Sequence, residues 1–517
     1  MSGGLSLGDL VREIPGGVRV LGDTTVRVRG VQQDSRRVSE GDLFVARAGA
    51  HTSGLSYLDE ACRRGASAVL CAHDVSLPTD LKLPALIVGD VATGMAFAAA
   101  AVYGHPSFGL DVVGITGTNG KTTTSHLVRA AIDGALGETR CGVIGTTGYQ
   151  YRDLALAATH TTPESDELAR VLAAMKGRGA THAVMEVSSI ALASGRVRAI
   201  RFRVGAFTNL TQDHLDYHGS MSRYAAAKKL LFTACTPGVA VINVDDAMGS
   251  SLVRDVTAPL LRVSAQTGAA PSRADVAPRS VQMGPEGFAA TVDTPAGELM
   301  LRSRLVGKHN LENFLLALGI ALALDLDAKA VAEALVEERG APGRLERCDA
   351  VGDEITVLVD YAHTPDALAR VLDAVRSVGP GRLWCVFGCG GDRDAKKRGP
   401  MGDAVGRRAD VAIVTNDNPR TEAPAAIAVP IVEGATFAGM RATQRPCVER
   451  GYIVELDRAR AIERAVLESA PGDIVLIAGK GHEDYQIMGE EKRAFDDRIE
   501  ARQALSKRRL RGIGPRK

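Results

Sequence analysis

The chain has 517 residues, of which 45% are apolar and 24% are charged, so it is long enough for about three folded domains and lacks the composition of a disordered chain. A formal net charge of +1 excludes a global electrostatic field that would hold nucleic acid or a membrane surface. We find no run of the ~18 apolar residues that a membrane-spanning helix needs, and no basic segment followed by an apolar one at the N-terminus. We therefore expect a cytoplasmic protein that uses neither nucleic acid nor membrane insertion.

The eight cysteines are scattered through apolar stretches, and none forms a C-x-x-C pair. Zinc sites and disulfide frameworks depend on such paired spacings. The closest pair, Cys385 and Cys389, flanks a glycine-rich turn without an accompanying histidine. We interpret the cysteines as buried free thiols.

Residues 1–106 alternate short strand and helix patterns, which predicts a small α/β domain with its own core. Apolar runs predict its strands at residues 41–46, 68–71 and 85–88. A helix is expected from Tyr57 to Gly65, and the polar loops at Ser35 and His51 could bind a ligand or form surface turns. The turn residues from Tyr103 to Ser107 indicate a linker.

A phosphate-binding loop is predicted where the apolar run Val112–Ile115 leads into Gly117-Thr118-Asn119-Gly120-Lys121-Thr122-Thr123. Such a turn directs successive backbone N–H groups at one point, and the helix that follows adds the positive end of its dipole. Lys121 is expected to reach the β and γ phosphates of a nucleotide, and the Thr122 hydroxyl to ligate Mg²⁺. Ile115 stands where the strict pattern has its first glycine, so the loop is a shortened variant. An ordinary glycine-rich strand-to-helix turn is the alternative.

Apolar runs that end in polar loops predict a mostly parallel sheet in the central domain, residues 107–341. The runs are residues 112–115, 183–185, 204–207 and 239–242. Ligands bind at the carboxyl ends of such strands, and Glu186, directly after the second run, is a candidate Mg²⁺ ligand. Asp213, His214 and Asp216 follow the third run. They are either functional or form a solvated helix start with a structural histidine.

Residues 251–305 change to a strand-like pattern, and residues 287–292 and 299–302 predict an antiparallel hairpin. The segment Gly307–Asn313 then opens a long helix rich in alanine and leucine. Asn310 and Asn313 share one face of this helix because they are three residues apart. They are capping residues or nucleotide contacts.

The alternation of strands and loops resumes in residues 342–517 and predicts a Rossmann-like domain. Each of its four strands ends in a polar or charged loop. These loops are Asp360–His363, Gly388–Asp394, Thr415–Arg420 and Gly479–Glu483.

The order of these motifs resembles that of the Mur ligases, ATP-dependent amide-bond ligases of peptidoglycan synthesis, and within them the members that add meso-2,6-diaminopimelate to UDP-N-acetylmuramoyl-L-alanyl-D-glutamate. Besides the four loops above, the similar segments are residues 34–36, 41–46, 117–123, 160–163, 186–189, 213–214, 224–228, 307–313 and 342–346. The resemblance implies three α/β domains. Residues 1–106 would bind the uridine nucleotide, residues 107–341 would form the central P-loop ATPase, and residues 342–517 would bind the amino acid.

The resemblance also implies a catalytic set of Lys121, Glu186, His214 and Lys228. Lys228 would be carbamylated and would ligate a second Mg²⁺ beside His214, while Thr122 and Glu186 would hold the first. A carbamate offers the oxygen atoms that Mg²⁺ prefers, whereas an ammonium group cannot ligate a cation. Without the family, Lys228 would be interpreted as a solvated helix lysine.

Three groups of binding residues follow from the same resemblance. ATP would be bound by residues 117–123 together with Asn310 and Arg344. The UDP-muramoyl-dipeptide would be bound by Ser35, Ala50, His51, Thr52, Thr161, Thr162, Ser188, Ser194 and Arg196. Diaminopimelate would be bound by Arg393, Asp417, Asn418, Pro419, Arg420, Gly479 and Glu483. The partners would then be small molecules alone, and we expect a monomer.

Within the family the loop Asp417–Arg420 marks diaminopimelate as opposed to lysine. Diaminopimelate carries a distal carboxylate that lysine lacks, and a guanidinium group suits bidentate carboxylate recognition. Glu483 is expected to pair with an ammonium group. The alternatives are a ligase that uses L-lysine, a ligase that extends folate, and a P-loop kinase or nucleotide-binding regulatory protein without ligation.

Three positions depart from the family pattern. Ile190 replaces a histidine after the paired serines, Ser194 replaces a glutamine, and Ser53 replaces an acidic residue in the first-domain loop. These changes leave the ATPase motifs intact and could alter the affinity for the nucleotide substrate.

Overall fold

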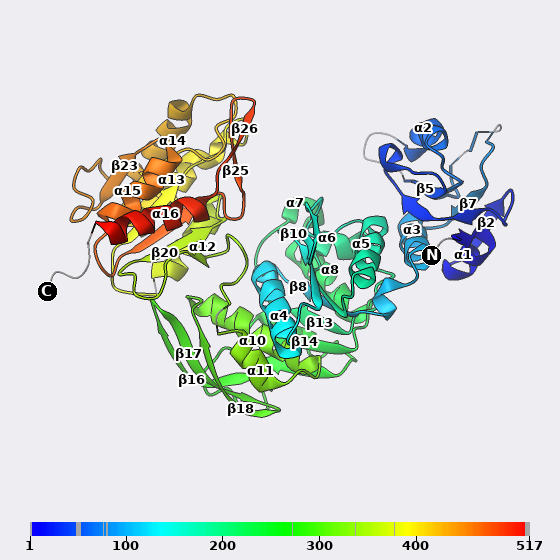
Figure 1. The fold of residues 1–517 in the computed structure, drawn as a ribbon, viewed down its shortest axis with the longest axis horizontal. Coiled ribbons are helices and arrows are strands. Elements are labelled where there is room, and N and C mark those ends of the chain that lie inside the picture. The colour runs from blue at the N-terminus through cyan, green and yellow to red at the C-terminus, as the bar shows by residue number, and fades with distance from the viewer. Residues whose placement is uncertain are drawn as a thin grey trace. The chain divides into compact units, whose positions relative to one another are not determined.

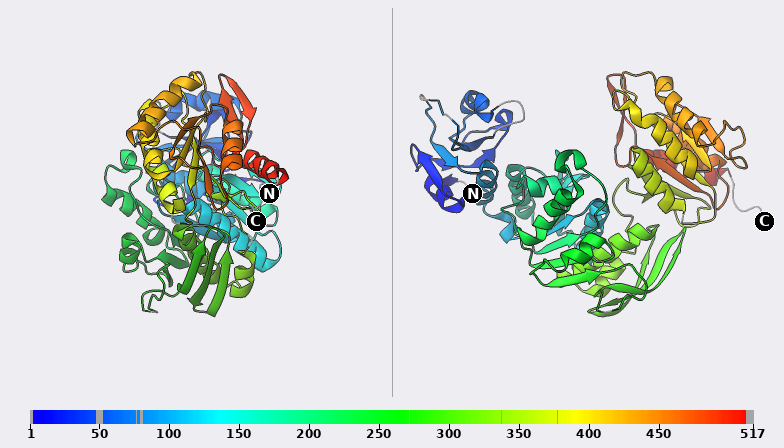
Figure 2. Two further views of the ribbon diagram at one scale, coloured as in Figure 1. Left: turned by 90° about the vertical axis from the view of Figure 1, so that its left-hand side faces the viewer. Right: turned by 180° about the vertical axis from the view of Figure 1, so that it is seen from behind.

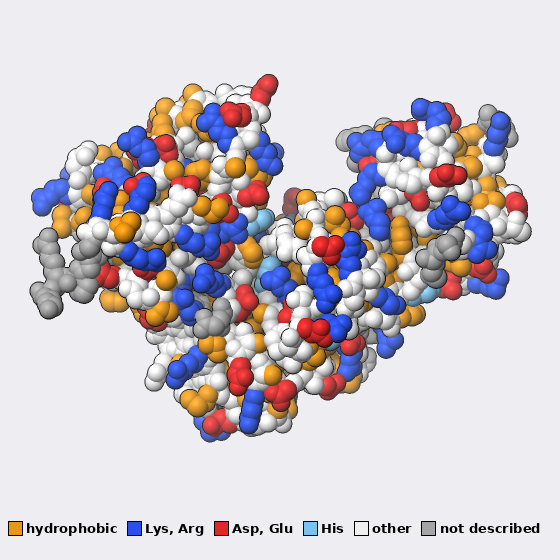
Figure 3. Space-filling model, viewed as in Figure 1, with side chains coloured by type: hydrophobic (Ala, Val, Ile, Leu, Met, Phe, Trp, Pro, Cys, Tyr) orange, Lys and Arg blue, Asp and Glu red, His pale blue; other side chains and the backbone are white. Residues whose placement is uncertain are grey.

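The computed structural model describes residues 3–47, 53–75, 77–78, 81–270, 272–336, 338–376 and 378–511, and it confirms an α/β fold with mostly parallel sheets (Figure 1). These residues form two compact units. The first extends to Ala277 and includes residues 294–296 and 315–331, and the second comprises residues 278–293, 297–314 and the described residues from Ala332 onward. None of the described helices is long and apolar enough to cross a membrane. On the visible face of the molecule, acidic and basic side chains are interspersed (Figure 3).

A five-stranded sheet organises the N-terminal part of the first unit. Its order is β2-β7-β6-β5-β4, and β2 alone runs antiparallel to its neighbour. The elements are α1 (Leu7–Glu13), β2 (Val18–Leu21), β4 (Gly30–Gln32), β5 (Asp42–Ala46), α2 (Leu58–Arg63), β6 (Ala68–Ala72), β7 (Ala85–Val88) and α3 (Val91–Val102), with a separate short pair β1 (Leu5–Ser6) and β3 (Arg27–Val28). The strands and the helix predicted here from the sequence are confirmed.

Strand β5 shows why its sequence is a continuous apolar run. Leu43 and Val45 pack into the core that contains α3, whereas Phe44 and Ala46 pack into the core that contains α2. Successive side chains of a strand point to opposite faces, and both faces of this sheet are covered, so the four positions from Leu43 to Ala46 are all apolar.

The central sheet of the first unit has eight strands in the order β11-β10-β9-β12-β8-β13-β14-β15. The strands are β8 (Asp111–Thr116), β9 (Cys141–Gly145), β10 (Gly148–Tyr151), β11 (Leu154–Leu156), β12 (His182–Glu186), β13 (Val204–Phe207), β14 (Val239–Asn243) and β15 (Leu260–Val263). The strands β9, β12, β8, β13, β14 and β15 are parallel to one another. Strands β10 and β11 form an antiparallel edge. The central sheet is therefore mostly parallel, as the sequence predicts.

Helices cover both faces of the central sheet (Figure 2). The helices of this region are α4 (Lys121–Leu136), α5 (Ser165–Gly177), α6 (Ser189–Ala193), α7 (Leu215–His218), α8 (Met221–Thr233), α9 (Ala247–Leu252), α10 (Lys308–Ala323) and α11 (Ala328–Ala334), of which the last two extend into the second unit. Helix α4 packs against β8, β9 and β12, and the core that includes α5 and α8 lies against alternate residues of the same strands. This arrangement leaves the carboxyl ends of β12, β8 and β13 side by side.

The second unit contains a three-stranded and a six-stranded sheet. The first has the order β16-β17-β18 and consists of β16 (Ala277–Gly284), β17 (Gly287–Thr294) and β18 (Gly297–Ser303), so the two strands predicted as a hairpin are neighbours. The second has the order β19-β20-β24-β21-β22-β23, and only β19 is antiparallel. Its strands are β19 (Glu346–Arg347), β20 (Thr356–Asp360), β21 (Leu383–Phe387), β22 (Val411–Val414), β23 (Gly451–Val454) and β24 (Ile474–Ala478).

Two helical layers enclose this six-stranded sheet. One core includes side chains of α12 (Pro365–Arg376), α13 (Arg398–Arg408) and α14 (Pro424–Phe437), and the other includes α15 (Arg458–Glu468) and α16 (Asp497–Leu510). A β-hairpin of β25 (Tyr485–Met488) and β26 (Glu491–Ala494) follows β24. Buried Arg458 pairs with Asp497 at 2.6 Å and donates to the carbonyl of Asn416, which fixes the loop after β22 to both α15 and α16.

Candidate active site

The segment between β8 and α4 has the geometry of a phosphate loop. Gly120 caps α4 in the left-handed region, with φ of 85°, and Gly117 has φ of 149°. Glycine adopts these angles without strain, and a Cβ atom on Gly117 would also overlap the Thr208 side chain. The strand, turn and helix predicted from the sequence are confirmed.

The amine of Lys121 lies inside the curve of this loop. Its Nζ donates to the carbonyl oxygens of Gly117 and Thr118, both at 2.9 Å. The loop is held from the neighbouring strand β13, because the Thr118 N–H donates to the Asn209 carbonyl at 2.8 Å and the Asn119 N–H donates to Asn209 Oδ1 at 3.0 Å. Sequence reasoning gives Asn209 no role, because its contacts with the loop depend on the adjacency of β8 and β13.

Glu186 ends β12 beside this loop, as predicted for a Mg²⁺ ligand. Its Oε2 accepts a hydrogen bond from the Thr122 hydroxyl at 3.0 Å, and its Oε1 accepts one from the Thr146 N–H at 2.8 Å. The side chain is buried. Hydroxyl and carboxylate oxygens suit Mg²⁺, which usually keeps several waters and takes further oxygens from phosphate. The described residues contain no cluster of three or more His, Cys, Asp or Glu side chains that would hold a metal alone, so Thr122 and Glu186 fit a site completed by phosphate and water.

Lys228 also contacts the phosphate loop, and its side chain is buried. Its Nζ donates to the Gly117 carbonyl at 2.7 Å and lies 4.4 Å from the centre of the Tyr224 ring. Tyr224 itself is 3.1 Å from the Thr118 hydroxyl. Burial, reinforced by the charge of Lys121, lowers the pKa of Lys228 to about 6. The structure therefore excludes the surface lysine that the sequence alone would suggest.

His214 begins α7 with a left-handed backbone, and its ring is half exposed. Its Nε2 lies 3.6 Å from Asp213, and its ring centre is 6.2 Å from that of Tyr224. The buried His218, which sequence reasoning missed, lies nearer to Tyr224, at 5.2 Å, and its Nε2 is 2.9 Å from the Ser189 hydroxyl. No described hydrogen bond joins His214 to Lys228, so its role as a metal ligand stays a prediction.

The pH dependence of stability tests the surroundings of Lys228. Its pKa is about 6 in the folded chain, against an ordinary value of 10.5, so the unfolded chain binds the extra proton between these two values. The free energy of unfolding should therefore rise with pH in this window, and Lys228→Met should remove that rise. Chemical denaturation of the wild type and Lys228→Met in CO2-free buffer at several pH values measures the free energy of unfolding of each protein.

Lys229→Met is the matched control for this experiment. The Lys229 ammonium is partly exposed and pairs with Asp255 at 2.9 Å, so its loss should leave the wild-type slope unchanged. Parallel profiles for the wild type and Lys228→Met would contradict the lowered pKa of Lys228.

Hydroxyl groups assigned to the muramoyl-peptide gather around the end of β12. Thr162 Oγ1 donates to the Glu186 carbonyl at 2.9 Å and accepts from the Ser188 N–H at 2.9 Å. Arg196 donates to the Thr162 carbonyl at 3.0 Å. The Thr161 hydroxyl lies 3.3 Å from that of Thr146. The predicted residues Thr161, Thr162, Ser188 and Arg196 are therefore close together.

The five other residues assigned to the nucleotide substrate make different contacts or are not described, and Ser53, which departs from the family pattern, is considered with them. The Ser194 hydroxyl faces the Ala191 carbonyl of its own helix at 3.5 Å. Ser35 donates to Glu60 at 2.6 Å in the N-terminal region, and Ser53 caps a short 3₁₀ helix through the Leu55 N–H. Ala50, His51 and Thr52 lie outside the described residues.

Glu164 is a residue that sequence reasoning missed. One of its oxygens pairs with Arg196 at 2.8 Å and the other with Arg47 at 2.7 Å. Arg47 follows β5 of the N-terminal sheet and also donates to Gln33 at 2.9 Å. Through these contacts, Glu164 joins the N-terminal sheet of the first unit to the cluster of hydroxyl-bearing residues around Thr162.

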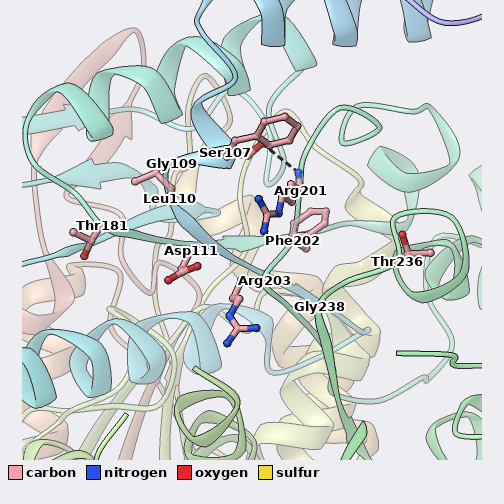
Figure 4. A pocket seen from close by; sticks show the side chains of 11 residues that line it. Ser107, Gly109, Leu110, Asp111, Thr181, Arg201, Phe202, Arg203, Thr236 and Gly238 are labelled. Atoms are coloured by element: carbon pink, nitrogen blue, oxygen red, sulfur yellow. Dashed lines mark hydrogen bonds between the residues drawn. The ribbon is translucent and has the colours of Figure 1, made fainter. Parts of the chain in front are cut away.

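A cavity of about 510 Å³ lies at the amino ends of the central strands (Figure 4). Its lining includes Asp111, the first residue of β8, and Arg203, which pairs with Asp325 at 2.9 Å. The Arg201 N–H donates to the Ser107 hydroxyl at 3.2 Å. Because the phosphate loop follows the carboxyl end of β8, this cavity is separate from the site described above.

Three family models match the chain. They describe a Mur ligase family catalytic domain over residues 27–102, a Mur ligase middle domain over residues 115–321 and a Mur ligase glutamate ligase domain over residues 343–481. A UDP-N-acetylmuramoyl-L-alanyl-D-glutamate–2,6-diaminopimelate ligase of Gloeobacter violaceus is 43% identical over 488 residues, which are 94% of this chain and 96% of the relative. The chain belongs to the Mur ligase family.

Solved structures agree with this membership. A structure of a UDP-N-acetylmuramoyl-L-alanyl-D-glutamate–2,6-diaminopimelate ligase is 31% identical, with a TM-score of 0.72 over 98% of this chain and 99% of the other. The MurF ligase of Thermotoga maritima, solved in complex with ADP, is 17% identical, with a TM-score of 0.56 over 94% of this chain and 98% of the other. The second likeness supports the fold alone.

In this Mur ligase, the loops assigned to diaminopimelate meet at the carboxyl edge of the six-stranded sheet. A Cβ atom added to Gly388 or Gly391 would overlap the carbonyl oxygens of Thr415 or Pro419, so glycines allow the loops after β21 and β22 to touch. Arg420 donates from Nη1 to the Gly391 carbonyl at 2.7 Å. The glycine-rich loop therefore supports the arginine that we assign to carboxylate recognition.

Other members of this predicted group adjoin the same loops. Asn418 donates to Glu483 at 3.1 Å, and a Cβ atom on Gly479 would lie 3.5 Å from an Asp417 oxygen. Arg393 is exposed on the loop after β21. The structure thus brings Asp417, Asn418 and Glu483 into one cluster.

Asn310 and Arg344 of this Mur ligase belong to the second unit, whereas the phosphate loop belongs to the first. Buried Asn310 donates to the Val306 carbonyl at 2.9 Å, and the Arg344 guanidinium stacks over Tyr361 with 4.9 Å to the ring centre. Their contact with ATP therefore stays a prediction.

Proposed function

We propose that this Mur ligase joins meso-2,6-diaminopimelate to the D-glutamyl γ-carboxylate of UDP-N-acetylmuramoyl-L-alanyl-D-glutamate at the expense of ATP. The observation that carries the proposal is the placement of Lys121, Thr122 and Glu186 around one phosphate loop. A relative 43% identical over 94% of the chain bears the name of this activity. The domain boundaries at residues 106 and 341 and action as a cytoplasmic monomer are further parts of the proposal.

The first step transfers the γ-phosphoryl group of ATP to the γ-carboxylate and yields an acyl phosphate and ADP. Lys121 lies where its ammonium group can neutralise charge on the phosphoryl oxygens, and the backbone N–H groups of the loop orient them. Mg²⁺ bound by Thr122 and Glu186 would supply further positive charge there. The residues around Thr162 and Arg196 would hold the muramoyl-peptide beside the loop.

In the second step the diaminopimelate amine attacks the acyl carbon. A tetrahedral intermediate forms, its nitrogen loses a proton, and it expels phosphate, which leaves an amide bond. Arg420 would orient the distal carboxylate of the amino acid, and Glu483 an ammonium group. These contacts hold the attacking amine in position, which is the main contribution that a binding loop can make to this step.

The surroundings of Lys228 support its proposed carbamylation. Carbamate formation needs an uncharged amine, whose nitrogen attacks CO2 and releases a proton to solvent. A pKa of about 6 leaves most Lys228 side chains uncharged at neutral pH. The carbamate oxygens would then be available to a second Mg²⁺, for which His214 is the other proposed ligand.

The mass of the product tests the proposed reaction. The purified protein is incubated with ATP, Mg²⁺, the UDP-muramoyl-dipeptide and either meso-diaminopimelate or L-lysine. We expect a UDP-muramoyl-tripeptide that contains diaminopimelate, with one ADP per product, and phosphate release only when both acceptor and amino acid are present. A product that contains lysine would instead support the lysine-adding alternative. Formation of many equivalents of ADP per enzyme without the amino acid would support a kinase.

A further inference from the structure

Lys480 is a buried lysine. The resemblance assigns its neighbours to amino-acid binding but gives no role to Lys480. It follows β24, and its side chain is 0% exposed. Its Nζ donates to Asp417 Oδ1 at 3.3 Å, to Asn418 Oδ1 at 3.1 Å and to Glu483 Oε2 at 3.3 Å. One ammonium group therefore joins three of the side chains assigned to diaminopimelate.

The backbone around Lys480 holds the ammonium group in this place. Gly479 and Gly481 have φ of 122° and 54°, angles that favour glycine. A Cβ atom on Gly481 would lie 2.7 Å from Tyr361 Cβ, and the Glu483 N–H donates to the Lys480 carbonyl at 2.9 Å. A tight turn between glycines thus determines where the side chain begins.

The charges around Lys480 suit one particular kind of ligand. Asp417 and Glu483 bring two negative charges to a largely buried place, where Lys480 offsets one of them. Arg420 brings a second positive charge on the loop that carries Asp417. The cluster thus has as many positive as negative charges, and it can offer one of each to the ammonium and carboxylate of an amino-acid group.

We propose that Lys480 is a positioning residue that fixes Asp417 and Glu483 and balances their charge, so that the site accepts the zwitterionic distal end of diaminopimelate. The proposal rests on the proposed function of the chain. Without Lys480 the two carboxylates would repel each other and would also repel the distal carboxylate of the substrate. An amino acid with a distal ammonium group alone, such as lysine, would suffer less from this change.

The test compares Lys480→Met with the wild type in the full-length protein. We expect the KM for diaminopimelate to rise at least about tenfold, as for lost hydrogen bonds to charged groups, and the KM for ATP to stay within about twofold. The preference for diaminopimelate over lysine, measured as the ratio of kcat/KM, should fall. Lys480→Arg keeps the charge and should recover part of the loss.

Lys492→Met is the matched control. Lys492 is exposed in β26, with its Nζ 3.9 Å from the centre of the Tyr485 ring, and no described hydrogen bond or ion pair joins it to Asp417 or Glu483. Its loss should leave both KM values within about twofold of the wild type. A melting curve for each variant checks that the fold is intact.

Two results would overturn the positioning role. In the first, the Lys480→Met variant has the same KM as the wild type for the amino acid that the wild type accepts. In the second, its KM for ATP rises by as much as its KM for that amino acid. The proposed function fails separately, if the wild type forms no product with diaminopimelate. In that case a crystal structure of the Lys480→Met variant tests whether Lys480 positions its neighbours. Displaced Asp417 and Glu483 side chains would support the positioning role, and side chains in their wild-type positions would contradict it.

Discussion

Replacing Lys121 by methionine is expected to lower kcat about 10³-fold, the scale seen when a preorganised electrostatic contact to a transition state is lost. The Lys121 amine lies within 2.9 Å of two carbonyls of the phosphate loop, where a bound phosphoryl group would be within its reach. Methionine keeps the length of the side chain without its charge. ADP release and product formation measure the effect.

Lys229→Met provides the control for this prediction, since it removes a partly exposed ammonium group on α8. It should retain wild-type turnover. Melting temperatures of both variants near that of the wild type would show that the fold is intact. Near-normal ADP release from Lys121→Met would contradict the assignment of this loop to ATP.

Replacing Arg420 by methionine is expected to raise the KM for diaminopimelate about 100-fold, because a guanidinium–carboxylate pair provides directional hydrogen bonds that no apolar side chain replaces. The KM for ATP should change by less than about threefold. Lysine lacks the distal carboxylate, so its use should be affected much less. Steady-state kinetics with each substrate varied in turn give all three values.

Arg407→Met is the control for Arg420→Met. Arg407 is an exposed arginine of α13 that pairs with Asp403 at 2.8 Å, away from the predicted loops. The Arg407→Met substitution should leave the KM for each substrate unchanged. Equal losses for diaminopimelate and ATP in Arg420→Met would mean that the loop has another role.

Local patterns were sufficient to predict the phosphate loop and Glu186. The strand, glycine turn and Gly-Lys-Thr sequence lie within a dozen residues, and the parallel sheet brings the end of β12 to the same edge as the end of β8. The carboxyl-edge rule for parallel sheets then places Glu186 beside Thr122 without any knowledge of side-chain packing. The phosphate loop needed only local spacing, whereas the place of Glu186 beside it also depended on the adjacency of β8 and β12, which the structure shows.

Other parts of the site depend on contacts between distant segments. Lys228 meets the Gly117 carbonyl across 111 residues of sequence, and its burial changes it from an apparent surface lysine to an uncharged amine. Lys480 stands between two glycines, which by themselves suggest a surface turn. His218 lies in a short helix whose burial no periodicity reveals. For such residues, tertiary packing determines the chemistry.

The register of three central strands has a consequence for folding. In β8 and β12, Ile115 pairs with Glu186, and in β8 and β13, Thr116 pairs with Phe207. A slip of β12 by one residue would move Glu186 by about 3.3 Å and turn its side chain to the other face of the sheet. Only chains with correctly paired strands therefore present Thr122 and Glu186 together, and any nucleotide that binds there stabilises those chains by mass action. A nucleotide bound at this site would therefore also stabilise the paired register of β8, β12 and β13.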